Sequence, residues 1–200
     1  MINIERRLAF IHINKTAGSS IERAMGWVHD ESSHMTVKEL STVIDLRQFY
    51  KFSFIRNPYD KIVSQYHHRK QNMKDEILKD LTFKDWVKNL DELGFGIKGT
   101  GNQCTWLSLQ DWIWDVEKQE YTTRPDEIQF AVDFIGYFEE LQSDWKELQD
   151  EVKIFPYIKL PHRRKSKHNH YREYYDDETQ EIIYKRFEDD FKVFNYKFKE

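Results

Sequence analysis

The sequence predicts an α/β fold in which a central parallel sheet lies between layers of helices, a three-layer arrangement. Residues 8–13 form a short apolar run, and residues 51–56 repeat the same order; each is followed by turn-forming residues and then by a helical pattern. Such runs are typical of buried strands in a parallel sheet. Strands that alternate with helices form right-handed crossover units, so the helices cover both faces of the sheet.

The first of these units runs from the strand at residues 8–13 through a loop at residues 14–20. A helix is expected to start near Ile21. The loop ends in Gly-Ser-Ser, and serine is a favoured N-cap residue, so we expect a serine cap on this helix.

The second unit runs from the strand at residues 51–56 into a helix that continues to about Asn72. Asn57 and Pro58 predict its start, because a capping residue is followed by proline at the first helical position. The apolar stripe predicts where the other side chains lie. Ser64 is expected near the edge of the stripe, and Lys61, Gln65 and Arg69 are expected to point outward.

The rest of the chain continues the same alternation. The predicted elements are a helix at 82–93, a glycine-rich break at 94–101, a polar surface excursion at 117–126, strands at 133–137 and 152–155, a helix at 140–148 and a capped helix at 177–194. Ligands of such folds bind beyond the carboxyl ends of the strands. The loops after Ile13 and after Ile55 are therefore the candidate sites.

Length and composition limit the possible classes of protein. The chain has 200 residues, which fits one domain over residues 1–200, and a net charge of −4, which gives no general attraction to nucleic acid. Its one cysteine, Cys104, cannot form an internal disulfide, and no stretch is apolar enough to span a bilayer. We expect a cytoplasmic protein without a metal site; the sequence does not indicate an oligomeric state.

The loop at residues 14–20 has the composition of an anion site. Free amide groups at the start of a helix bind sulfate or phosphate, and Lys15 adds a positive charge while Gly18 allows close approach to the backbone. An ordinary capped helix beside a solvated lysine would have the same sequence. The loop lacks the pattern G-x-x-x-x-G-K-[ST], which disfavours a P-loop-type small-molecule kinase but leaves it as an alternative.

Arg56 and Ser64 predict a second anion site, because a guanidinium fork and a hydroxyl suit a phosphate group. The alternative is that Arg56 pairs with Asp60 and that Ser64 is simply a buried helical serine.

The residues around both loops resemble the sulfotransferases that use 3′-phosphoadenylyl sulfate (PAPS). Residues 10–20, Phe-Ile-His-Ile-Asn-Lys-Thr-Ala-Gly-Ser-Ser, resemble their 5′-phosphosulfate loop, and residues 52–66 resemble their 3′-phosphate motif. The resemblance is closest to the carbohydrate and heparan-type branch and continues through residues 133–141 and 171–196. It implies a P-loop-NTPase-like sulfotransferase fold. It also implies in-line transfer of a sulfuryl group from PAPS to a hydroxyl acceptor, a carbohydrate in that branch, without a metal.

Position by position, the resemblance also implies roles for individual residues. The 5′ end of the donor is assigned to Lys15, Thr16, Ala17, Gly18, Ser19 and Ser20, and the 3′-phosphate to Arg56, Ser64, Arg164 and Ser166. Lys15 would also stabilise charge on the departing phosphate oxygen. Asn14 departs from the family pattern, which usually has proline there, and proline would stiffen the loop.

The acceptor must lose a proton, and histidine is the side chain that titrates near neutrality. The candidates are His12, His29, His34, His67 and His68. Residues 33–40 resemble a histidine motif of this branch, so His34 is the expected base and Glu31 the second choice. Trp86, Trp106, Trp112 and Trp114, with Tyr121, could form a platform for an acceptor, although Trp and Tyr at these spacings are more often core or interface residues. By resemblance Gln103 lines the acceptor site.

The basic segment at residues 163–167 leaves one further alternative open. Its dense positive charge would suit a non-enzymatic module that binds an anionic polysaccharide. Among enzymatic acceptors, lipid, peptide tyrosine and small alcohols remain open beside carbohydrate.

Overall fold

A computed structural model describes residues 1–28, 31–72, 80–90, 101–109, 114–115, 120–121, 128–154, 156–161 and 168–198. The chain divides into two compact units, each described by itself below. Unit 1 comprises Met1–Ile55 and Gln103–Arg163, and unit 2 comprises Arg56–Asn102 and Arg164–Glu200. A single domain stays a prediction. His29, Arg164 and Ser166 lie outside the described residues. So do the glycine-rich break, except for Gly101, and the polar excursion, except for residues 120–121.

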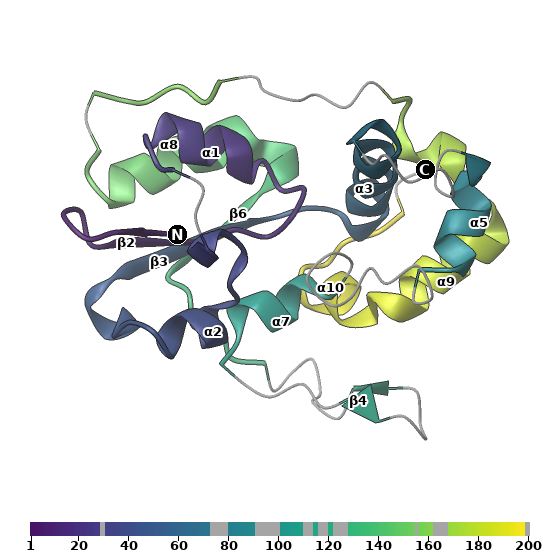
Figure 1. The fold of residues 1–200 in the computed structure, drawn as a ribbon, viewed down its shortest axis with the longest axis horizontal. Helices are drawn as coiled ribbons and strands as arrows, with labels where there is room; N and C mark the ends of the chain where they lie inside the picture. The colour runs from purple at the N-terminus through teal and green to yellow at the C-terminus, as the bar shows by residue number, and fades with distance from the viewer. Residues whose placement is uncertain are drawn as a thin grey trace. The chain divides into compact units, whose positions relative to one another are not determined.

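Unit 1 is built on a four-stranded sheet in the order β1-β2-β3-β6 (Figure 1). The strands are β1 (Ile2–Asn3), β2 (Leu8–Ile11), β3 (Tyr50–Ile55) and β6 (Phe134–Tyr137). The pairs β2-β3 and β3-β6 are parallel, with Phe10 opposite Phe52 and Phe52 opposite Phe134, whereas β1 runs antiparallel to β2. The predicted α/β fold is confirmed, with an antiparallel edge strand added.

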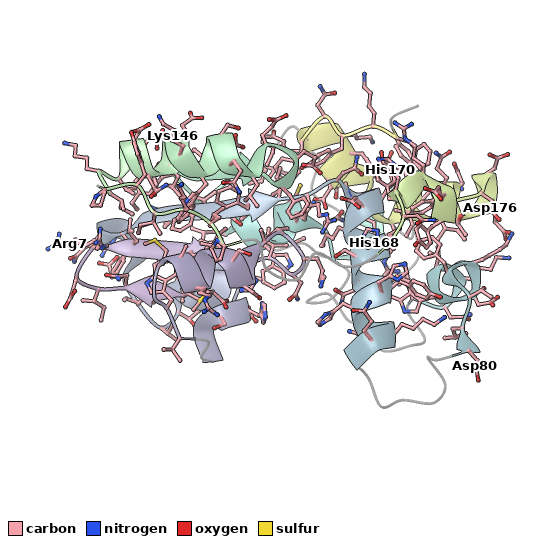
Figure 2. All side chains as sticks on the ribbon, turned by 90° about the horizontal axis from the view of Figure 1, so that it is seen from above. Arg7, Asp80, Lys146, His168, His170 and Asp176 are labelled. Atoms are coloured by element: carbon pink, nitrogen blue, oxygen red, sulfur yellow. The ribbon has the colours of Figure 1, made fainter. Side chains whose placement is uncertain are left out.

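Helices lie on both faces of this sheet (Figure 1). Helices α1 (Gly18–Ala24) and α8 (Leu141–Glu151) cover one face, and α2 (Val37–Ser41) and α7 (Gln103–Leu107) lie on the other. A cluster of buried side chains joins the first pair to the sheet: Phe10, Ile21, Phe52, Phe54, Trp145 and Leu148. The outer face of α8 carries charged side chains such as Lys146 (Figure 2). The remaining elements of unit 1 are η1 (Glu31–His34), η2 (Leu46–Gln48), β4 (Trp114–Asp115), β5 (Glu120–Tyr121) and η4 (Phe138–Glu140).

The prediction of a strand at residues 152–155 is wrong for residues 152–154, which are the described ones. Residues 152–154 end helix α8 instead, with Ile154 N donating to Gln149 O at 2.9 Å and Lys153 N donating to Asp150 O at 3.4 Å. Lys153 has a φ of 54°, so it takes the left-handed position that closes a helix in this hydrogen-bond pattern.

Gly136 in β6 lies directly under the ring of Phe54 in β3. A Cβ at residue 136 would lie 2.3 Å from Phe54 Cε1, and Phe54 is fully buried, so the ring has little room to move. We expect Gly136→Ala to lower the free energy of unfolding by about 1–3 kcal/mol, measured by urea denaturation. The cost should shrink in a Phe54→Leu background, and an equal cost in both backgrounds would contradict the steric cause.

Unit 2 consists of helices around an aromatic core. The helices are α3 (Pro58–Asn72), α5 (Phe83–Lys88), η5 (Tyr171–Tyr174), α9 (Asp177–Arg186) and α10 (Glu188–Val193). Their buried side chains are Tyr59, Ile62, Val63, Tyr66, Phe83, Trp86, Val87, Leu90, Tyr171, Ile183, Phe187 and Phe191. The predicted start of α3 is confirmed, since Tyr59 N donates to Asn57 Oδ1 at 3.0 Å. Asp176, labelled in Figure 2, forms a capping box with Thr179 at the start of α9.

Two predictions for unit 2 are wrong. The single helix at residues 177–194 is broken at Phe187, whose φ of −116° separates α9 from α10 while its ring stays buried. Lys61 and Gln65 do not point outward but are buried. Lys61 Nζ donates to Gly101 O at 3.0 Å and lies 5.6 Å from the centre of the Phe187 ring, so its long stem packs in the core while its charge is solvated by protein.

Candidate functional site

The loop after β2 has an unusual backbone. Lys15 has a φ of 69° and Ala17 a φ of 68°, so two residues with side chains adopt the left-handed conformation. Between them Thr16 is buried, and its hydroxyl donates to Ile13 O at 2.8 Å. Backbones that alternate between left-handed and right-handed conformations turn successive N–H groups toward one side and form concave anion sites. Thr16 therefore holds the loop from inside, between two residues of positive φ, and the anion site stays a prediction.

The expected serine cap on α1 is wrong. The N-cap is Ala17, which makes no side-chain cap, and its carbonyl accepts from Ser20 N at 2.8 Å and from Ile21 N at 3.2 Å. The left-handed turn at Ala17 brings the chain into the helix two or three residues earlier than a cap at Ser19 or Ser20 would. Ser19 and Ser20 then lie in the first turn, so neither hydroxyl is used to cap the helix.

Gly18 is covered by the side chain of His12. A Cβ at residue 18 would lie 1.8 Å from His12 Nε2, which no flexible adjustment of a few tenths of an ångström would relieve. The His12 ring stacks on Phe10 with 5.4 Å between ring centres, and its Nδ1 lies 2.6 Å from Glu22 Oε1 on α1. The glycine therefore serves a contact inside the protein.

His34 lies beside this cluster, at the end of η1. Its ring centre is 4.4 Å from that of His12, and its Nδ1 lies 3.2 Å from His12 O. A carbonyl oxygen only accepts, so this contact favours the tautomer in which Nδ1 carries the proton and the basic lone pair is on Nε2. The structure brings together the expected base and the start of α1, whereas the role of His34 stays a prediction.

Arg56 and Ser64 belong to unit 2, where both are buried. Arg56 comes directly after β3, and its Nε and Nη2 lie 2.9 and 2.7 Å from Asp60 Oδ2. Ser64 is 3% exposed. The pair with Asp60 is the alternative arrangement that the sequence allowed, and the 3′-phosphate contact of Arg56 is a separate expectation. That contact stays a prediction.

Several other sequence candidates lie elsewhere. His67 stacks on His168 with 5.1 Å between ring centres, and burial, followed by His168 and Lys70, lowers the pKa of His67. Trp86 and Trp106 are core residues with 1% exposure, so they offer no platform to an acceptor. Gln103 is fully buried as well, and Trp112 lies outside the described residues.

Unit 2 also contains a pocket of about 490 Å³ between α9, α10 and the residues that follow them. Its lining includes Tyr59, Asp177, Glu181 and Tyr184. Burial, followed by Tyr184 and Glu181, raises the pKa of Tyr59 to about 12. Acidic side chains disfavour an anionic ligand, and none of the predicted site residues lines this pocket.

Two residues of functional interest were missed by sequence reasoning. Glu22 follows Gly18 by four positions, so both lie on one face of α1, and a carboxylate on that face was a sign of a partner there. Lys61 gave no comparable sign, because a lysine on a helix is usually solvated.

Among the described residues, no three His, Cys, Asp or Glu side chains gather closely enough to hold a metal ion. Within the same part of the chain, every helix is too short or too polar to cross a membrane.

Comparison with known proteins gives one match. A family model described as "Sulfotransferase family" matches residues 1–197, which is nearly the whole chain. Searches of curated proteins and of solved structures found no match.

Proposed function

The chain belongs to the sulfotransferase family, and from this premise we propose that it transfers the sulfuryl group of PAPS to a carbohydrate hydroxyl. The observation that carries the proposal is the loop after β2. Within a chain matched by the family, the left-handed residues Lys15 and Ala17 support an anion site in this loop, because such residues can turn backbone N–H groups toward one side.

The donor's two anionic ends are assigned to different parts of the chain. Residues Lys15, Thr16, Ala17, Gly18, Ser19 and Ser20 would hold the 5′-phosphosulfate. Arg56 and Ser64 would bind the 3′-phosphate, joined by Arg164 and Ser166 from the basic segment. Because Thr16 uses its hydroxyl proton on Ile13 O, its part is to shape the loop, and the backbone N–H groups supply most of the donors.

The reaction is written as an in-line displacement at sulfur. The acceptor oxygen forms a bond to sulfur as the bond between sulfur and the phosphate oxygen breaks. The acceptor's proton passes to His34 Nε2, and adenosine 3′,5′-bisphosphate leaves with the extra negative charge on its 5′-phosphate. Lys15 stabilises that charge. The scheme requires no metal.

A thermal-shift experiment tests the donor class. Adenosine 3′,5′-bisphosphate at about 100 times its Kd should raise the Tm by about 5–10 °C, because a ligand that binds only the folded state stabilises it. ATP with magnesium should give a much smaller shift. A selective response to ATP would instead support the kinase alternative, and no response to either nucleotide would sink the proposal.

The acceptor is tested separately, by incubating the protein with PAPS and a panel of oligosaccharides, tyrosine peptides, lipids and small alcohols. Mass spectrometry should show an added sulfuryl group on an oligosaccharide. Binding of an anionic polysaccharide without any transfer would favour the non-enzymatic module.

Arg56 provides a test of the 3′-phosphate assignment. We expect Arg56→Ala to weaken binding of adenosine 3′,5′-bisphosphate by about 10–100-fold, since a charge-assisted hydrogen bond is lost. Binding of adenosine 5′-phosphate, which lacks the 3′-phosphate, should change by less than about 3-fold. Isothermal titration calorimetry measures both affinities.

The control for this prediction removes the partner of Arg56 as well. Arg56→Ala leaves the carboxylate of Asp60 without its guanidinium, which could disturb the start of α3. The double variant Arg56→Ala/Asp60→Ala avoids that and should lose the same selectivity. Equal losses for both nucleotides in the double variant would show that Arg56 does not read the 3′-phosphate.

A further inference from the structure

His12 lies at the centre of three elements of unit 1 and is almost fully buried, at 5% exposure. Its backbone carbonyl is 3.2 Å from His34 Nδ1, and its ring lies against the ring of His34. The same ring fills the space that a Cβ of Gly18 would need. One residue at the end of the sheet thus contacts both the expected base and the start of α1.

Glu22 holds this ring from the other side. Glu22 is 7% exposed, and its Oε1 lies 2.6 Å from His12 Nδ1. The two side chains are in contact at ion-pair distance, without hydrogen-bond geometry at Nδ1, and Nε2 is the ring atom nearest the Cβ position of Gly18. A buried carboxylate needs such a partner. The contact between His12 and Glu22 therefore ties the end of the strand to the helix across the loop at residues 13–17.

We propose that His12 and Glu22 are positioning residues, which fix α1 and the anion-binding loop against the end of β2 and hold His34 at a set place beside them. This inference rests on the proposed function, since it assigns the base and the loop the roles given above. In this arrangement His12 touches neither the donor nor the acceptor. Gly18 is small because His12 occupies its side-chain space, and the donor would use only its backbone N–H.

The physical need for such a pair is geometric. A misplacement of reacting groups by 1 Å can cost about 100-fold in rate. The hydrogen bond from Thr16 to Ile13 O supports the loop from inside, but Lys15 and Ala17 both adopt a conformation that is unfavourable for residues with a Cβ, so a further contact is needed to hold it. A contact that bridges the loop keeps its two ends at one separation, and the same ring sets the position of His34.

The decisive experiment is a rescue. Gly18→Ala should lower the Tm and weaken binding of adenosine 3′,5′-bisphosphate by at least about 10-fold, because Cβ and the imidazole overlap. The double variant His12→Ala/Gly18→Ala removes the overlap. It should recover the Tm in part and regain part of the nucleotide affinity lost in Gly18→Ala. Full affinity should not return, because the ring that fixes the loop is missing, and turnover should stay about 100-fold lower than in the wild type.

Each result of this experiment has a definite meaning. If the double variant binds nucleotide as poorly as Gly18→Ala, the glycine serves the donor and the proposal is wrong. If the double variant turns over at the wild-type rate, His12 does not position the base and the proposal is wrong. If the wild type itself binds no adenosine 3′,5′-bisphosphate, the proposed function fails. Recovery of the Tm in the double variant still tests whether the His12 ring occupies the side-chain space of residue 18.

A second pair of variants covers the case in which the double variant does not fold. Glu22→Gln keeps a polar side chain of the same shape beside His12 Nδ1, whereas Glu22→Ala removes it. We expect Glu22→Gln to retain kcat within about 3-fold and Glu22→Ala to lower kcat by about 100-fold, with the nucleotide Kd changed much less. Equal kcat values for the two variants would overturn the positioning role of Glu22.

Discussion

Replacing Lys15 by alanine is expected to lower both donor affinity and kcat, the latter by about 100–1,000-fold. The ammonium of Lys15 would attract the phosphosulfate in the ground state, and it would stabilise the additional charge on the departing phosphate oxygen in the transition state. An interaction that strengthens as charge develops acts on kcat as well as on binding. Steady-state kinetics with PAPS, together with calorimetric titration of adenosine 3′,5′-bisphosphate, measure the two effects separately.

The backbone at Lys15 calls for a matched control. Its φ of 69° suits glycine better than alanine, so part of any loss in Lys15→Ala could come from the loop. Lys15→Gly removes the charge and also eases the backbone. Both variants should be equally slow, and Arg6→Ala, which removes an exposed charge from the same unit, should be unchanged. A Lys15→Gly variant with wild-type kcat would show that the charge has no catalytic role.

Replacing His34 by alanine is expected to lower kcat by about 100–10,000-fold and to leave the affinity for adenosine 3′,5′-bisphosphate nearly intact. The base acts only on the acceptor's proton, so the loop that would hold the donor keeps its groups. The measurement is turnover with PAPS and an oligosaccharide acceptor, beside calorimetry of the desulfated donor.

His34→Asn separates a base from a merely structural residue. The amide of asparagine can donate to His12 O in place of Nδ1, but it has no basic lone pair. We expect the asparagine variant to be as slow as the alanine variant. Recovery of turnover with asparagine would mean that His34 acts by holding the chain, and the base would then have to be sought elsewhere.

Much of the fold could be predicted because local patterns and packing agree. The apolar runs gave β2 and β3, and the cap at Asn57 with Pro58 gave the start of α3. The errors occurred where the tertiary structure overrides local preference. Lys153 closes α8 in a left-handed conformation without the usual glycine, so Val-Lys-Ile-Phe resembled a strand. The break at Phe187 carries neither glycine nor proline, which are the residues that mark such breaks in a sequence.

The candidate site could be predicted only in part, because some of its contacts depend on the tertiary structure. Lys15, Gly18 and His34 could be found from sequence spacing and from the resemblance to sulfotransferases. The contact between His12 and Gly18 could not, because it depends on where a ring from the sheet projects relative to a helix. The burial of Lys61 was hidden as well, since only the structure shows Gly101 O within reach of its ammonium.

The left-handed residues Lys15 and Ala17 have a consequence for how the proposed anion site forms. Each costs about 1–2 kcal/mol relative to a right-handed conformation, so a free peptide with this sequence would seldom adopt the loop's shape. The cooperative formation of strand and helix on either side must supply that free energy. The site is thus assembled in the same event that folds unit 1, and any anion that binds it draws the folding equilibrium toward the native state.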